Sequence, residues 1–162
     1  MNARFKPIVA AALSAIGVAI LGALTTDLGP WYFNLHKPAW QPPDWLFGPA
    51  WTLIFALSAV AGVVFWRSTT DRAARWQMLA AFACNAFLNT FWSLLFFRLK
   101  RPDWALEEVG FLWLSIVALI VILGRESRTS GWLLAPYLAW VSFAAFLNYT
   151  IVRINAPFTT GG

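Results

Sequence analysis

One apolar stretch near the middle of the chain carries amides and aromatic rings at helical spacing. With the pattern i, i+4, i+7 and i+11, a single helical face would present Asn85, Asn89, Trp92 and Phe96. Polar side chains are costly within an apolar span, so their positions carry information. This face could bond to a ligand and stack on it, or the amides could simply bond to neighbouring helices. The residues alone leave both alternatives open.

Two other apolar stretches could complete a pocket around this face. The later one, at spacing i, i+3, i+7 and i+11, presents Tyr137, Trp140, Ala144 and Asn148. The small Ala144 between large rings would leave a hollow. The earlier one presents Trp51 and Phe55, one helical turn apart. Together the three faces predict an aromatic-walled cavity with few polar groups, which is the usual character of a small-molecule pocket.

Other reactive residue types are sparse, and they form no catalytic motif or metal site in the sequence. Glu107 and Glu108 are expected to pair with Arg98 or Arg101, with a proton relay as the less favoured alternative. For His36, the single histidine, we expect a structural or interfacial role rather than ligation of haem iron, which commonly uses a second axial ligand. No required cofactor is therefore expected.

The composition is that of a membrane protein. Of the 162 residues, 60% are hydrophobic and 12% are charged, whereas soluble domains carry about 25% charged residues. The net charge is +5, but the basic residues lie between apolar runs, so we expect the lipid bilayer and not nucleic acid as the partner. The single cysteine, Cys84, excludes an intrachain disulfide, and we expect it to be buried as a small hydrophobe.

Five stretches are long and apolar enough to span a bilayer as helices. Their approximate ranges are 7–26, 47–66, 77–97, 104–124 and 131–152. The first follows a basic N-terminus, as in a signal peptide, but it is interpreted as a retained helix because of its length. The predicted fold class is an all-α integral membrane protein, a five-transmembrane-helix bundle, with residues 1–162 forming a single domain. The basic residues are divided too evenly between the two sides to assign an orientation.

The first connection, residues 27–49, is long and rich in proline and aromatic residues. The prolines restrict the backbone, and the aromatic content argues against disorder. We therefore expect a stiff loop that closes over the pocket as a lid. In the preceding span, small residues recur every four positions, which would allow close helix packing within the chain or a dimer seam. These residues are Ala11, Ala15, Ala19 and Ala23.

The loop and the start of the next span share one dense motif. From residue 31 to residue 51 it reads W-Y-x-x-L-x-K-P-x-W-x-P-P-x-W-x-F-x-P-x-W. This motif closely resembles the signature of the translocator protein family, also called TspO/MBR, tryptophan-rich sensory proteins or peripheral-type benzodiazepine receptors. Segments 89–97, 104–106, 136–140 and 147–155 resemble the third, fourth and fifth helices of that family, in the right order and spacing. On these motifs the chain is identified as a bacterial member.

The resemblance implies a five-helix bundle, usually a homodimer, that binds porphyrins such as protoporphyrin IX and haem. It also implies binding of benzodiazepine-type and isoquinoline ligands and, in some members, of cholesterol. The residues that it places at the ligand cavity are Tyr32, Pro42, Trp51, Phe55, Asn89, Trp92, Trp140 and Ala144. Asn85 is a departure, because many bacterial members carry Gln there, and it belongs to the expected site. The sterol-recognition stretch of the family corresponds to Leu147, Tyr149 and Arg153, for which a structural role is an equal alternative.

Three functions are compatible with these residues. The favoured one is a membrane receptor, sensor or transporter in a bacterial cell envelope that binds tetrapyrroles in the aromatic cavity beneath the first loop, with sterols as an additional expected ligand. The first alternative is enzyme-like, light-dependent porphyrin degradation, with Trp51 and Trp140 as the photochemical residues. The second alternative is a structural membrane scaffold, in which the aromatic residues would form only an interfacial belt.

Overall fold

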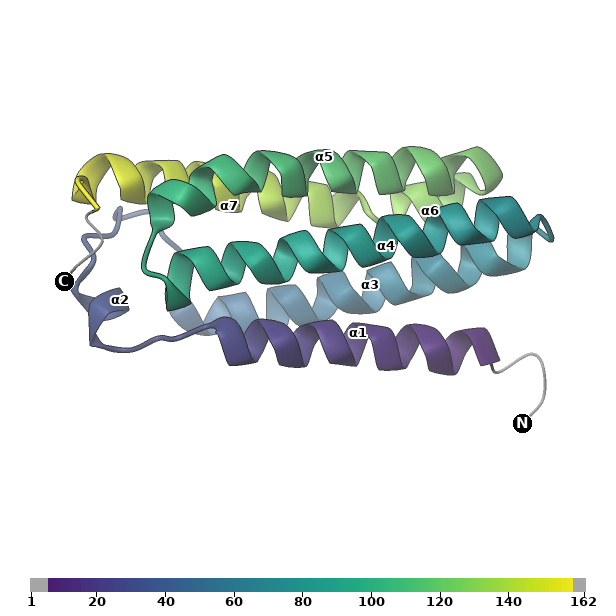
Figure 1. The fold of residues 1–162 in the computed structure, drawn as a ribbon, viewed down its shortest axis with the longest axis horizontal. Coiled ribbons are helices and arrows are strands. Elements are labelled where there is room, and N and C mark those ends of the chain that lie inside the picture. The colour runs from purple at the N-terminus through teal and green to yellow at the C-terminus, as the bar shows by residue number, and fades with distance from the viewer. Residues whose placement is uncertain (1–5, 159–162) are drawn as a thin grey trace.

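A computed structural model describes residues 6–158, and most of them lie in helices (Figure 1). The helices are α1 (Lys6–Thr25), α2 (Pro30–Asn34), α3 (Phe47–Ser68), α4 (Arg72–Ser93), α5 (Pro102–Glu126), α6 (Arg128–Trp132) and α7 (Ala135–Asn155). A 3-10 turn, Asp44–Leu46, precedes α3, and a π-helical turn, Leu94–Arg98, follows α4.

Five helical segments within residues 6–158 are long and apolar enough to cross a membrane, which confirms the predicted fold class. They are Pro7–Thr25, Asp44–Ser68, Arg72–Arg98, Pro102–Glu126 and Arg128–Asn155, with mean hydropathy between 1.4 and 2.3. The start of α1 lies at one end of the bundle, together with the α3–α4 and α5–α6 connections (Figure 1). The first loop and the end of α7 lie at the other end.

Two of these segments differ from the ranges expected from hydropathy. α4 begins at Arg72 rather than near residue 77, because the Asp71 carboxylate caps its first turn. That carboxylate accepts hydrogen bonds from the backbone N–H groups of Ala73 and Ala74 at 3.0 and 3.3 Å. The last span is divided into α6 and α7. Pro136 lies in the first turn of α7, where its missing N–H costs no helical hydrogen bond.

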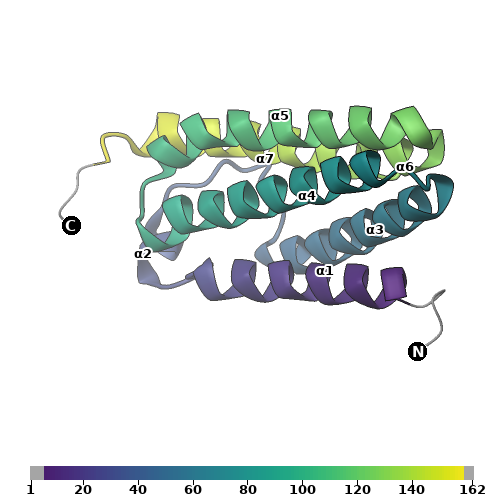
Figure 2. The same ribbon diagram turned by 45° about the vertical axis from the view of Figure 1, so that its right-hand side comes forward.

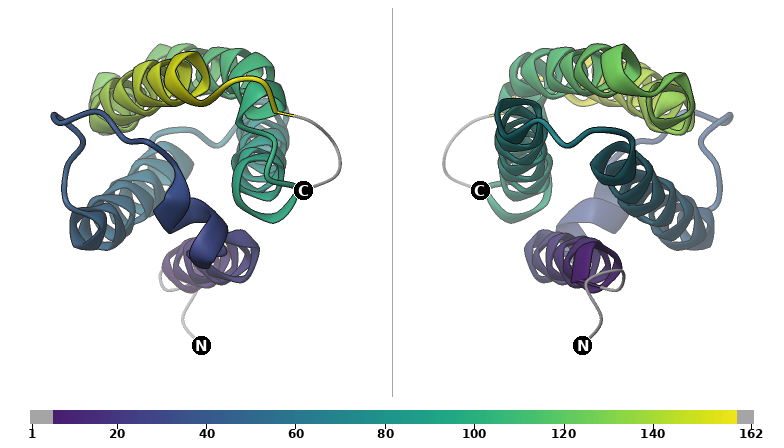
Figure 3. Two further views of the ribbon diagram at one scale, coloured as in Figure 1. Left: turned by 90° about the vertical axis from the view of Figure 1, so that its left-hand side faces the viewer. Right: turned by 90° about the vertical axis from the view of Figure 1, so that its right-hand side faces the viewer.

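Seen along its long axis, the bundle is a ring of helices in the order α1, α3, α7, α5, α4 (Figure 3). α5 packs on both α4 and α7, and it contributes to all three buried clusters, from Ala105 near the loop to Leu123 at the far end. α1 packs on α3 and α4, yet none of its described side chains is buried. α1 is therefore the least buried helix of the bundle, and α5 contributes to its core along the whole length.

Gly131 brings α6 against α5. A Cβ atom at this position would lie 3.1 Å from Gly124 Cα and 3.1 Å from the carbonyl oxygen of Ile120. Both are backbone atoms that cannot rotate away, so only glycine fits without a backbone shift. This close approach fixes the turn that leads into α7.

The first loop crosses the end of the bundle. Figure 2 shows the chain rising from α2 to α7 and then descending to α3. α2 and the 3-10 turn give this segment regular structure.

Two of the single-residue predictions are wrong. Cys84 is exposed on the surface of α4 rather than buried. Glu107 is exposed, and Glu108 is buried with no hydrogen-bond partner for its carboxylate oxygens among residues 6–158. Arg101 pairs instead with Asp103, which lies two residues away in the first turn of α5.

Candidate ligand-binding site

A chain of hydrogen bonds in the middle of the bundle joins α4, α5 and α7. The Tyr137 hydroxyl donates to Asn85 Oδ1 at 3.1 Å and accepts from Asn89 Nδ2 at 3.2 Å. Asn85 Nδ2 donates to Ser115 Oγ at 2.9 Å. Asn85, Asn89 and Tyr137 are all buried. In this conformation the two amides of α4 therefore bond to neighbouring helices.

An aromatic wall rises from this network toward the first loop. Trp51 stacks on Phe55 with ring centroids 5.4 Å apart, and it meets Tyr137 edge-on at 6.0 Å. Trp92 stacks on Phe96 at 5.2 Å. Such pairs leave flat ring faces in contact with one another rather than with solvent.

Trp140 completes the wall from α7. Its ring lies 5.6 Å from those of Phe47 and Phe143. Its indole Nε1 is buried and has no acceptor among the described residues. A buried indole N–H usually has a partner, so this donor suits the acceptor atom of a ligand.

Tyr32 holds the loop together at the top of this wall. Tyr32 is the buried residue of α2, and its hydroxyl donates to Asp44 Oδ1 at 2.7 Å. Lys37 Nζ lies 3.7 Å from the Tyr32 ring centroid and 4.0 Å from Asp44 Oδ2. Gln41 Nε2 also donates to Asp44 Oδ1, at 3.2 Å. The pKa of the Tyr32 hydroxyl is raised above its ordinary value, first by burial and then by the carboxylate of Asp44.

The loop is also fastened to α7 at two points. The Asn155 side chain accepts from the backbone N–H of His36 and donates to its carbonyl oxygen, both at 2.8 Å. Trp40 stacks on Phe146 with centroids 5.2 Å apart. His36 therefore joins the loop to α7 through its backbone, and the histidine itself is exposed.

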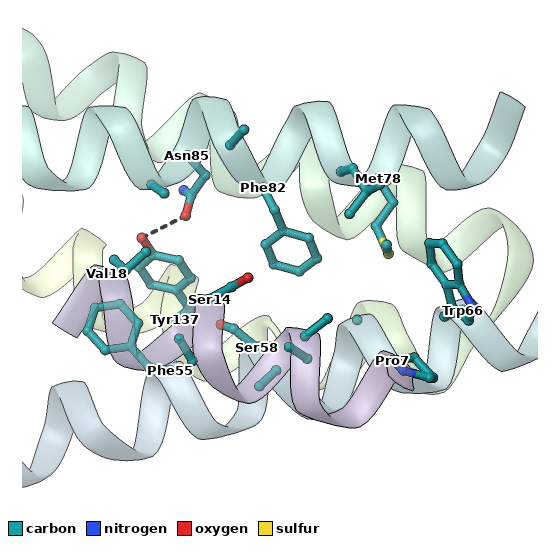
Figure 4. A pocket seen from close by; sticks show the side chains of 18 residues that line it. Pro7, Ser14, Val18, Phe55, Ser58, Trp66, Met78, Phe82, Asn85 and Tyr137 are labelled. Atoms are coloured by element: carbon teal, nitrogen blue, oxygen red, sulfur yellow. Dashed lines mark hydrogen bonds between the residues drawn. The ribbon is translucent and has the colours of Figure 1, made fainter. Parts of the chain in front are cut away.

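Two cavities accompany these elements, and they divide the expected site residues. A small cavity of about 40 Å³ beneath the loop is lined in part by Tyr32, Trp92 and Ala144. A much larger one of about 710 Å³ lies between α1, α3 and α4, and Phe55 and Asn85 line it together with Tyr137 (Figure 4). The remaining expected residues are Trp51, Asn89 and Trp140, in the structures described above, and Pro42, which lies half-buried in the loop.

The family model for TspO/MBR matches residues 9–154, which include the loop and the helices of both cavities. The chain belongs to the TspO/MBR family. It is similar to the tryptophan-rich protein TspO of Chlorobaculum tepidum, with 39% identity over 77% of this chain and 80% of that protein. It is also similar to the tryptophan-rich sensory protein of Cereibacter sphaeroides (35% identity, 88% of each chain) and to the translocator protein of Homo sapiens (31% identity, 77% of this chain and 75% of that protein). Together with the five spanning helices, this places the chain in a membrane as an integral protein.

The sterol-recognition stretch of this TspO/MBR chain does not form one surface. Leu147 is buried in the cluster beneath the loop. Tyr149 and Arg153 are exposed, and Arg153 Nη1 donates to the Tyr149 hydroxyl at 3.2 Å. Between them, the buried Asn148 amide, in the orientation that satisfies both of its groups, donates to the carbonyl of Pro102 at 3.0 Å. Sterol binding at this stretch stays a prediction.

Sequence reasoning missed the polar partners that organise this TspO/MBR site. Asp44 and Ser115 were not singled out, although Asp44 is the one acidic residue within the loop motif. The wall that α1 contributes to the large cavity was also missed. The regular spacing of Ala11 and Ala15 could have indicated this wall, since both residues line that cavity. Ala19 and Ala23 are exposed, so a dimer seam at that end of α1 stays a prediction.

Proposed function

We propose that this chain is a membrane receptor that binds a flat tetrapyrrole, such as protoporphyrin IX or haem, against the aromatic wall beneath the first loop. The observation that carries the proposal is the buried Trp140 indole N–H, which has no acceptor among residues 6–158 and lies within a wall of aromatic rings. A mostly apolar wall with a few oriented polar groups is typical of small-molecule sites. The names of the relatives from Cereibacter sphaeroides and Homo sapiens support a sensing or translocating role.

The closed loop leaves too little room for such a ligand. The cavity beneath it measures about 40 Å³, whereas small-molecule pockets typically measure about 300–1,000 Å³. Binding therefore requires the loop to lift and the rings of Trp92 and Trp140 to separate from their neighbours. The receptor would exchange a closed, ring-filled state for an open, ligand-filled one.

Each part of the wall has a role in this proposal. Trp51 and Trp140 would stack on the macrocycle, since flat rings prefer offset stacking. The Trp140 N–H would donate to a polar atom at the ligand edge. Lys37, which now contacts Tyr32 and Asp44, would meet a propionate when the loop moves.

The test is a titration of detergent-purified protein with protoporphyrin IX in the dark, read by quenching of tryptophan fluorescence. Trp140→Phe keeps an aromatic ring but removes the unpaired donor, so we expect affinity to fall about fivefold or more. Trp132→Phe is the matched control, because Trp132 is 76% exposed on α6 at the far end of the bundle. The Trp132→Phe variant should bind protoporphyrin IX with the affinity of the wild type.

Saturable quenching that Trp140→Phe weakens and Trp132→Phe leaves unchanged would support a defined site. Quenching that rises linearly without saturation, equally in all three proteins, would mean that the porphyrin only dissolves in the micelle. The proposal would then fail.

A further inference from the structure

The larger cavity lies in the half of the bundle opposite the first loop, and the proposed tetrapyrrole site does not use it. Its volume is about 710 Å³. Figure 4 shows Val18, Phe55, Asn85 and Tyr137 at one end and Pro7, Trp66 and Met78 at the other. On α1 the lining residues run from Pro7 to Val18, which at 1.5 Å per residue is a length of about 16 Å. The cavity is therefore long and runs along the helices.

The wall of this cavity is apolar along most of its length. From α1 the wall receives three alanines, Pro7 and Val18 beside the hydroxyl of Ser14, and from α3 its apolar residues are Phe55, Ala59, Gly62 and Trp66. The polar groups at the inner end, Asn85 and Tyr137, already bond to each other and so need no ligand. Such a space suits a flexible hydrocarbon chain better than a ligand with polar edges.

Ser58 does not change this conclusion. Its hydroxyl is buried in the middle of the cavity wall without a partner among the described residues. A serine in a helix can turn its hydroxyl toward the carbonyl four residues earlier. Thr52 and Ser142 do so in this chain, at 2.9 and 2.8 Å. Ser58 can therefore satisfy its hydroxyl without a polar ligand.

The outer end of the cavity is basic. Arg75 lies over the Trp66 ring at 4.4 Å, and its Nη2 donates to the carbonyls of Trp66 and Thr69 at 2.9 and 2.7 Å. Its Nε is buried without an acceptor among residues 6–158. Arg67 and Arg72 are exposed at the same end, near the α3–α4 connection. The exposed Arg67 and Arg72 thus present donors to an anion at the membrane surface, and Arg75 adds positive charge beside them.

The other charged groups at this end do not neutralise it. The Asp71 carboxylate is engaged with the first turn of α4. The α5–α6 connection adds the exposed side chains of Arg125, Glu126 and Arg128, with one acid between two bases. A negatively charged headgroup is the complementary partner for this surface.

We infer that this cavity holds the acyl chain of an anionic amphiphile, with the chain between α1, α3 and α4 and the headgroup at Arg67, Arg72 and Arg75. α1 suits lateral entry of the chain from the bilayer, because none of its described side chains is buried and small residues form its contact with the cavity. The charged head stays at the membrane surface, where its desolvation cost is low. The amphiphile is either a fatty acid or a phospholipid that inserts one chain.

The test uses cis-parinaric acid, a fluorescent fatty acid, with purified protein in detergent and energy transfer from tryptophan as the readout. Ala59→Leu fills the cavity from α3, and Ala15→Leu fills it from α1. Ala80→Leu is the matched control, because Ala80 is exposed on α4 and does not line the cavity. We expect both filling variants to weaken binding at least tenfold and the control to bind as the wild type does.

Competition identifies the head and its source. Oleate should displace the probe at least tenfold better than methyl oleate, which has the same chain without the charge. If oleate displaces it, a fatty acid is the occupant. If dioleoylphosphatidylglycerol displaces it and oleate does not, the chain comes from a phospholipid, and the inference also stands. Equal displacement by oleate and methyl oleate would overturn the role of the basic end.

The filling variants also separate this inference from the proposed function. Ala59→Leu should still show saturable quenching by protoporphyrin IX, which demonstrates that it is folded. Unchanged probe binding in both filling variants would overturn the acyl-chain site while leaving the tetrapyrrole site intact. If Trp140→Phe loses protoporphyrin binding but still binds cis-parinaric acid, the proposed tetrapyrrole site is affected and the acyl-chain site is not.

Discussion

At the scale of single residues, the Tyr137 hydroxyl is the group that connects the hydrogen bonds in the middle of the bundle. It donates to Asn85 Oδ1 and accepts from Asn89 Nδ2, so it links α7 to α4 twice. A polar group that loses its partner in a bilayer cannot turn to water. The network therefore holds helices together where hydrophobic burial alone supplies little driving force.

Tyr137→Phe should lower the free energy of unfolding by about 1–2 kcal/mol, because the Asn85 carbonyl and an Asn89 donor both lose their partner. Unfolding of the detergent-solubilised protein by a denaturing detergent measures this. Tyr149→Phe is the control, since that hydroxyl is exposed and bonds only to Arg153 in the described chain. Equal stability of the two variants would contradict the structural role of the network.

Spacing alone placed Asn85 and Asn89 on one helical face, and both are buried on α4. It could not identify their partners, because cross-helix bonds depend on how α5 and α7 are rotated. The same limit explains the wrong pairing for Glu108. Its position near the start of the fourth span suggested a partner in Arg98 or Arg101, but the rotation of α5 turns Glu108 inward, and Arg101 pairs with Asp103 instead.

At the scale of elements, the close approach of α6 to α5 depends on a single residue, Gly131. A Cβ at Gly131 would lie 3.1 Å from two backbone atoms of α5, whereas one at Gly110, also in the bundle, would meet nothing within 4 Å. The two glycines therefore allow a matched comparison of the same substitution.

Gly131→Ala should destabilise the protein by about 1–3 kcal/mol, because the α5 and α6 backbones must separate. Gly110→Ala should leave stability unchanged or raise it by up to about 1 kcal/mol, since alanine favours the helix more than glycine does. Thermal unfolding in one detergent would compare them. A smaller loss at Gly131 than at Gly110 would disprove the packing argument.

The loop shows what a motif can and cannot predict at this scale. Its prolines and aromatic residues predicted a stiff connection, and α2 and the 3-10 turn lie within it. Its attachment could not be predicted, because Asn155 lies 119 residues from His36 in the chain. The two residues meet only when α7 is packed in the bundle.

At the scale of the whole molecule, hydropathy was sufficient to predict five membrane-spanning helices. It could not predict the division of the last span, which depends on Pro136 and the tight turn before it. It also could not predict where space remains between helices. The large cavity arises because α1 packs through small side chains on α3 and α4, which is a property of three helices together. Dimer formation stays a prediction.

The central claim for the molecule is that the first loop must open before a tetrapyrrole can enter. Asn155→Ala removes both hydrogen bonds that clasp the loop to α7. Opening should then be easier by about 1 kcal/mol, which raises the association rate about fivefold. Arg153→Ala is the control, because Arg153 lies at the same end of α7 and bonds only to Tyr149 among the described residues.

The most direct measurement is therefore stopped-flow association of protoporphyrin IX with the wild type, Asn155→Ala and Arg153→Ala. The account predicts faster association for Asn155→Ala alone. An association rate that is the same in all three proteins, or slower in Asn155→Ala, would contradict a gating role for the loop.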